Sequence, residues 1–175
     1  MKRAVLIAAC LFAAAPAFAQ SIGEKTGVNS MLGVTPATAD FVKEAASSDM
    51  FEIQSSQLAV QRSDDKTKAF ANQMISDHEK TTAELKSLVQ SGAVKAEIPT
   101  AMLPSHQSMF DKLKGLNGGD FTKQYHDDQV SAHKDAVSLY QRYAKGGDNE
   151  QLKSMASKTL PTLEHHLSMA QDLDK

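Results

Sequence analysis

Four residues have side chains that bind transition metals, yet they fall where apolar side chains are expected. They are Glu52, His78, His133 and His166. Each lies in a stretch with helical periodicity, and a projection at about 100° per residue places it on the apolar stripe. A buried carboxylate is costly unless it is paired or binds a metal. Because neutral imidazole and carboxylate are ligands for zinc, copper, iron and manganese, the four residues predict an interior metal site.

The alternative is a buried hydrogen-bonded network that fixes helix register without a metal. One inward histidine is more often bonded to a Tyr, Gln or Glu than to a metal, whereas four such positions favour a site. Both interpretations stay open at this stage. The residues that could support either kind of site are Asp49, Met74, Asp77, Tyr125, Gln129 and Tyr140.

The heights of the four residues along their helices leave open whether they form one site or two. Counted from the tight turns, Glu52 and His78 differ by ~6 Å, and His133 and His166 by ~10 Å. The remaining histidines are expected elsewhere, with His165 facing outward. The other two, which we expect on the surface, are His106 and His126.

Four long amphipathic helices are expected to position these residues. Apolar periodicity indicates them, and Ser or Asp at their starts is typical of N-caps. Gly92 should end the second helix, and Gly146-Gly147 the third. The expected ranges are 35 or 38 to about 62, 63–91 with Ser63 as cap, 120–145 with Asp120 as cap, and 148 to the C-terminus with Asp148 as cap.

Two tight turns and one long central connection predict an all-α, ferritin-like four-helix bundle. The connection spans 92–119, contains Pro99 and Pro104, and could include a short helix over 105–113. In the fourth helix, Pro161 either bends the helix ahead of His166 or separates two shorter helices.

The N-terminus carries a secretion signal. Lys2 and Arg3 precede an apolar run over 4–15, and Ala17-Phe18-Ala19 is a small-residue cleavage site. We therefore expect a signal peptide over 1–19, a flexible leader over 20–36, a bundle domain over 37–175, and a periplasmic location. A lipid anchor on Cys10 is disfavoured, because it would leave only about half of a normal apolar region before the cysteine.

The composition of the mature chain restricts the function further. Cleavage after Ala19 removes the single Cys, which excludes disulfides and thiolate chemistry, and leaves 17 basic against 21 acidic side chains. Without a basic block, nucleic acid is not an expected partner. No segment of the mature chain is apolar enough to span a membrane. An envelope protein as partner and the oligomeric state stay open.

These residues and motifs resemble a bacterial family of exported proteins, the domain of unknown function 4142 family, which is often labelled as outer membrane protein. The resemblance covers about residues 37–173 and implies a ferritin-like bundle in the envelope without an established reaction. The motifs are Phe41 and Glu52, Phe70-Ala71-x-x-Met74-x-x-Asp77-His78, Phe121-x-x-x-Tyr125 with Gln129 and His133, and Leu160-Pro161 ahead of His166-Leu167.

The pattern departs from that of iron-oxidising ferritins, which use Glu-x-x-His on two helices. The residues three positions before the three inward histidines are Ile75, Val130 and Leu163, and none is a carboxylate. Zinc or copper is therefore expected before iron, and Met74 would suit copper(I). We expect a non-enzymatic metal-binding bundle that serves envelope stress. The alternatives are a metal-free structural or interaction module and, third, a metal-dependent oxidoreductase or hydrolase.

Overall fold

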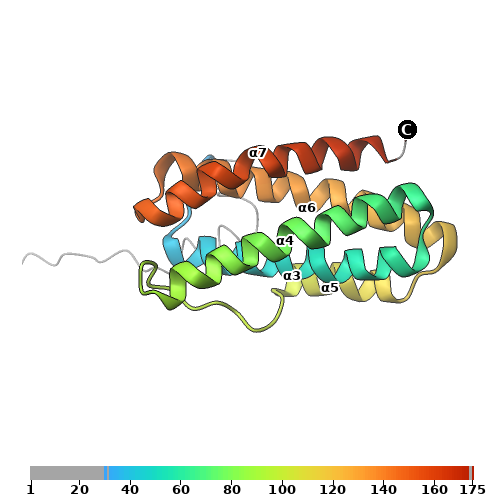
Figure 1. Cartoon of the computed structure of the whole chain (residues 1–175), viewed down its shortest axis with the longest axis horizontal. Coiled ribbons are helices and arrows are strands. Elements are labelled where there is room, and N and C mark those ends of the chain that lie inside the picture. Colours follow the sequence, from blue (N-terminus) through green and yellow to red (C-terminus); the bar gives the residue numbers. More distant parts are fainter. Residues whose placement is uncertain (1–29, 31, 174) are drawn as a thin grey trace, which may run out of the picture.

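A computed structural model of the chain describes residue 30, residues 32–173 and residue 175, and the long helices within them form one bundle. This confirms the predicted fold class, an all-α bundle with a long central connection. The expected signal peptide and most of the expected leader lie outside the described residues. The helices are α3 (Thr38–Arg62), α4 (Asp65–Gln90), α5 (Pro104–Lys114), α6 (Gly118–Gly146) and α7 (Glu150–Asp172) (Figure 1).

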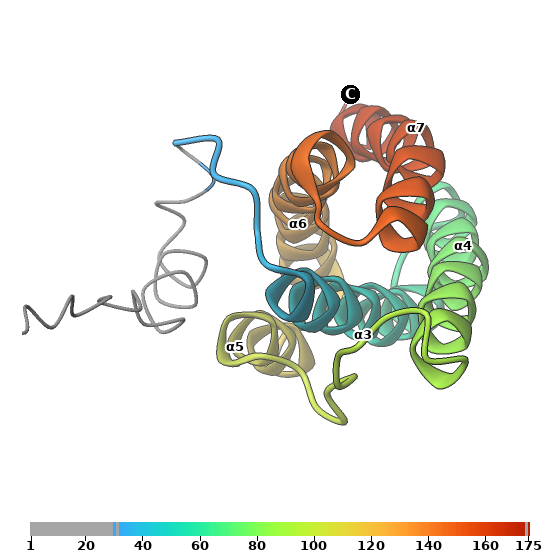
Figure 2. The same ribbon diagram turned by 90° about the vertical axis from the view of Figure 1, so that its left-hand side faces the viewer.

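The bundle consists of two helical hairpins joined by the long connection. α3 packs closely on α4 and α6 on α7, because a short turn joins each pair. Between the hairpins, α3 packs on α6 and α4 packs on α7. The short helix α5 lies outside the four-helix ring, against α3 and α6 (Figure 2).

The helices begin at slightly different residues from those predicted. Asp64, not Ser63, caps α4 by accepting a hydrogen bond from the Thr67 N–H at 2.9 Å. Asn149, not Asp148, caps α7, because Asp148 instead accepts a hydrogen bond from the Thr38 hydroxyl. α6 begins two residues before Asp120, which therefore lies in its first turn. Gly92 follows α4 with φ of 78°, as the predicted helix end requires.

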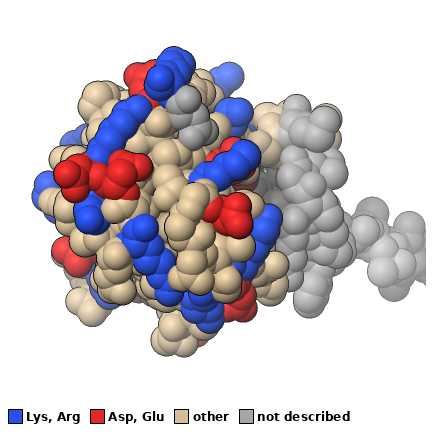
Figure 3. Space-filling model, turned by 90° about the vertical axis from the view of Figure 1, so that its right-hand side faces the viewer, with Lys and Arg blue, Asp and Glu red and all other residues tan. Residues whose placement is uncertain are grey.

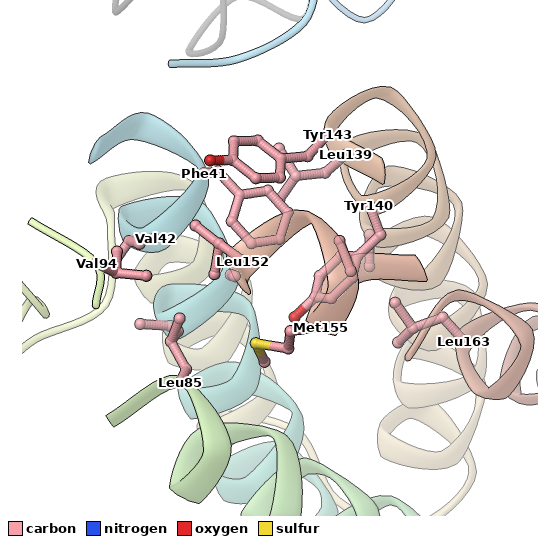
Figure 4. Close-up of a cluster of buried hydrophobic side chains, with 14 residues drawn as sticks. Phe41, Val42, Leu85, Val94, Leu139, Tyr140, Tyr143, Leu152, Met155 and Leu163 are labelled. Carbon is pink, nitrogen blue, oxygen red and sulfur yellow. The ribbon is translucent and has the colours of Figure 1, made fainter. Parts of the chain in front are cut away.

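The core is divided into two apolar clusters by the polar residues at its middle. In α4, Leu85 belongs to the first apolar cluster and Met74 to the second apolar cluster, with His78 between them. The clusters follow each other in the same order around His133 in α6 and in the reverse order around His166 in α7. Figure 4 shows the first cluster, in which α3, α4, α6 and α7 all contribute side chains. The polar layer therefore lies inside the bundle and not at its end.

α7 is one continuous helix that contains Pro161, so the alternative of two shorter helices is wrong. No helix in the described part of the chain combines the length and apolar character needed to cross a bilayer. On the end of the molecule shown in Figure 3, acidic and basic side chains are interspersed and form no single-sign patch.

Candidate metal centre

The histidines of three different helices meet at the middle of the bundle. His78 of α4, His133 of α6 and His166 of α7 each offer one ring nitrogen, and these atoms lie within 4.8 Å of one another. The ring centroids form a nearly equilateral triangle with sides of 5.6, 5.6 and 5.4 Å. Each residue is at most 2 % exposed. We call these three residues the histidine centre.

An outer partner fixes the orientation of His78. Its Nδ1 lies 2.8 Å from Asp49 Oδ1, and Asp49 also accepts hydrogen bonds from the hydroxyls of Thr81 and Thr82 at 3.0 Å. Because the carboxylate only accepts, Nδ1 carries the hydrogen. In the neutral ring, Nε2 therefore presents its lone pair. That Nε2 faces the centre and has no hydrogen-bond partner.

The other two histidines are held in the same manner. His133 donates from Nδ1 to the main-chain carbonyl of Gln129 at 2.9 Å, and His166 donates from Nε2 to Asp77 Oδ2 at 3.1 Å. The remaining nitrogens, His133 Nε2 and His166 Nδ1, are buried and have no partner. Metal-bound histidines are held in the same way: one ring nitrogen donates its hydrogen to an acceptor, and this fixes the tautomer that leaves the other nitrogen free for the metal. Each ring of the histidine centre therefore has one buried nitrogen without a hydrogen-bond partner.

Burial and charge separate the pKa values of the three rings. Burial, together with the charge of His78, lowers the pKa of His133 to about 3 and that of His166 to about 4. Burial also acts to lower the pKa of His78, but the hydrogen bond and charge of Asp49 and the charge of Glu52 outweigh it and raise that pKa. At neutral pH, His133 and His166 are thus neutral and free to bind a metal, whereas the surroundings of His78 favour its protonated form.

Glu52 lies beside the histidine centre and not among its converging atoms. Its Oε1 is 3.7 Å from His133 Nδ1, which is the nitrogen that faces away from the centre. Both carboxylate oxygens are buried without a hydrogen-bond partner. Burial raises the pKa of Glu52 to about 7, against the opposing effect of His78. The structure thus places Glu52 next to three predicted ligands without placing it among them.

A family comparison adds to this geometry. The sequence pattern of the family described as "Domain of unknown function (DUF4142)" matches residues 23–173. The chain belongs to this family. The resemblance predicted from the motifs is therefore confirmed.

A solved structure shares the fold of this chain. It is described as "CopM in the Cu(II)-bound form", with a TM-score of 0.65 and 16 % sequence identity. The match covers 79 % of this chain and 95 % of the other. No curated protein matches the chain in sequence.

The six residues predicted to support the centre divide into two groups. Asp49, Asp77 and the main chain of Gln129 contact the histidines, as described above. The other three make their contacts elsewhere: Met74 packs in the second apolar cluster, Tyr125 shares a hydrogen bond with Ser56, and Tyr140 packs against Phe41. The sequence alone does not distinguish the two groups, because all six residues lie on or near the apolar stripes of their helices.

Sequence reasoning missed Thr81 and Thr82, which hold Asp49 in place. A buried carboxylate such as that of Asp49 needs hydrogen-bond donors. Two hydroxyl residues one helical turn after His78 were the signal in the sequence that could have identified them. The expectation of a surface position was wrong for His126, which is buried with its Nε2 2.9 Å from the Thr67 hydroxyl. It was also wrong for His106, which is partly buried, contacts Ser47 and stacks on Phe51.

Proposed function

We propose that the protein is a non-enzymatic, periplasmic helical bundle that binds one transition metal ion at the histidine centre. The observation that carries the proposal is the convergence of three buried nitrogens without hydrogen-bond partners, each oriented by an acceptor behind it. Buried polar atoms normally have hydrogen-bond partners, so three buried acceptors without partners, within 4.8 Å of one another, indicate a site for a cation. Three imidazoles from three helices supply such an ion with a preformed set of ligands.

Zinc or copper fits this donor set better than iron. Imidazole is a ligand for both metals, and three histidines with an open position are a known arrangement for zinc. No residue three positions before His78, His133 or His166 is a carboxylate, as a di-iron site of the ferritin kind would need. The fold shared with the copper-bound CopM structure also supports copper. Glu52, whose Oε1 lies 3.7 Å from His133 Nδ1, is the candidate for a fourth ligand after rotation of its side chain.

The expected signal peptide supports a role outside the cytoplasm. A metal site whose three histidines are each at most 2 % exposed suits holding or buffering a metal ion rather than turnover. In this role the protein would protect the envelope from free metal, which agrees with the stress function expected from the sequence.

A metal-free polar network is the second candidate, and a specific observation supports it. Since the pKa of His78 is raised, a proton on its Nε2 could be shared with the lone pairs of His133 and His166. That proton would occupy the position proposed for the metal. The network would then fix the register of α4 against α6 and α7, with a loss of ~1–3 kcal/mol when one member is removed.

Calorimetric titration with zinc and with copper(II) distinguishes the two candidates. The purified protein is first treated with a chelator, and it is compared with the His78→Ala, His133→Ala double variant. We expect one metal per chain for the parent and at least a hundredfold weaker binding for the double variant. His165→Ala is the matched control, because His165 is exposed on the same helix as His166. No binding by the parent, or equal binding by the double variant, would leave the structural candidate.

A further inference from the structure

The three histidines differ in how closely their outer partners approach solvent. Behind His78, the side chain of Asp49 is 4 % exposed, and behind His133 the partner is a buried main-chain carbonyl. Behind His166, the side chain of Asp77 is 16 % exposed. Asp77 is therefore the one of these three partners that reaches the surface, with its carboxylate 3.1 Å from the ring of a residue in the centre.

Asp77 is held on its solvent side by exposed groups. Lys80 donates to Asp77 Oδ1 at 2.9 Å, and the lysine side chain is 72 % exposed. The amide of Gln73, also exposed, donates to Asp77 Oδ2. Exposed pairs of this kind are weak, typically below about 1 kcal/mol. An incoming divalent cation therefore has little to displace at this carboxylate.

Asp77 lies where one hairpin meets the other. It is on α4 and contacts His166 on α7, and no short turn joins these two helices. Figure 2 shows these two helices side by side along one wall of the bundle. α7 is weakened here, because Pro161, five residues before His166, cannot donate the main-chain hydrogen bond of that turn.

We propose that the metal ion reaches and leaves the histidine centre between α4 and α7, and that Asp77 is the ligand that first receives it. This inference rests on the proposed function. The Asp77 carboxylate would bind the cation in place of the Lys80 ammonium and release its hydrogen bond to His166. A small movement of the His166 ring would then transfer the ion to the three inner nitrogens. Asp49 cannot serve in this way, because it is enclosed by His78, Thr81 and Thr82.

The rate of metal loading tests the proposal. Chelator-treated protein is mixed with Cu²⁺ in a stopped-flow instrument and followed by quenching of tyrosine fluorescence, since the chain has no Trp. Release is measured by mixing the loaded protein with excess EDTA. Asp77→Asn keeps an acceptor for His166 but removes the charge, so we expect loading at least tenfold slower. Lys80→Gln frees the carboxylate, so we expect loading at least twofold faster.

A matched control and the release rate make the test decisive. Asp127→Asn removes an exposed carboxylate that is likewise paired with a lysine, Lys123 at 2.8 Å, but lies on α6 away from the centre. Its loading rate should change less than twofold. If Asp77→Asn only speeds release and leaves loading unchanged, Asp77 merely positions His166 and the proposal is overturned. If the parent binds no copper in calorimetry, the proposed function itself fails, which is a separate result.

Discussion

At the scale of single residues, the protein reverses the order of two acidities, because in water a glutamic acid loses its proton at a lower pH than a histidine. Burial raises the pKa of Glu52 to about 7 and lowers the pKa of His133 to about 3. Near neutral pH, the carboxyl is thus close to half protonated, and the neighbouring ring is neutral. A metal ion would bind the ring without displacing a proton there, and its positive charge would favour the ionised form of Glu52.

The raised pKa of Glu52 predicts how stability depends on pH in chelator-treated protein. Between pH 4.5 and about 7, the folded chain holds a proton on Glu52 that the unfolded chain has lost. This contribution to stability is therefore complete at low pH and is lost as the pH rises to about 7. Glu52→Gln does not titrate, so the variant does not lose this stability as the pH rises. Its free energy of unfolding relative to that of the parent should therefore increase by on the order of 2 kcal/mol between pH 5 and pH 8.

Denaturant unfolding at both pH values measures this difference. Glu79→Gln is the control, because Glu79 is an exposed carboxylate of α4 and its substitution should have the same effect at pH 5 and pH 8. If the difference in free energy of unfolding between Glu52→Gln and the parent is the same at both pH values, the carboxyl of Glu52 is ionised at both, and burial does not raise its pKa.

At the scale of helices, periodicity was sufficient to predict which segments are helical and which residues face inward. Leu85 and His78 both lie on the predicted inner stripe of α4, and both are buried. The capping residues were predicted less well. Asp148 was a reasonable cap by residue type, but its hydrogen bond to Thr38, on a helix far away in sequence, directs its side chain elsewhere. Contacts of this kind exist only after folding, so no local pattern indicates them.

A pair of neighbouring substitutions tests the orientation of α4. Leu85 is 1 % exposed and belongs to the first apolar cluster, whereas Lys86 is exposed. Leu85→Ala should lower the free energy of unfolding by ~2–5 kcal/mol, because it leaves a cavity among α3, α4 and α7. Lys86→Ala should change it by less than ~0.5 kcal/mol. Equal effects in denaturant unfolding would mean that the inner face of α4 is assigned wrongly.

At the scale of the whole molecule, the sequence predicted that four polar residues face inward, but not how they lie relative to one another. Each helix supplied its inward residue by pattern alone. Their relative heights depend on where the turns begin, and counting from the turns gave offsets of ~6 and ~10 Å. In the structure, α6 extends to Gly146 and α7 begins only at Glu150. The three histidines meet, and Glu52 stays beside them, which no single-helix pattern could have decided.

The position of the histidine centre has a consequence for the stability of the entire bundle. Its three residues belong to both hairpins, His78 to the first and His133 and His166 to the second, and they lie between the two apolar clusters. A metal ion would therefore connect the two hairpins at the middle of the bundle. A metal bound only by the folded state stabilises it by about 2.7 kcal/mol at a free concentration of 100 times Kd.

We therefore expect zinc at that concentration to raise the midpoint of thermal unfolding by about 5–10 °C, as the size of the domain implies. Circular dichroism at helical wavelengths measures this midpoint with and without metal. The His78→Ala, His133→Ala variant should start from a lower midpoint and show no rise, while His165→Ala should behave like the parent. A rise of equal size in the double variant would place the stabilising metal outside the histidine centre. No rise in a parent that binds zinc by calorimetry would mean that the unfolded chain binds the ion as well as the folded one, so that the centre is not preformed.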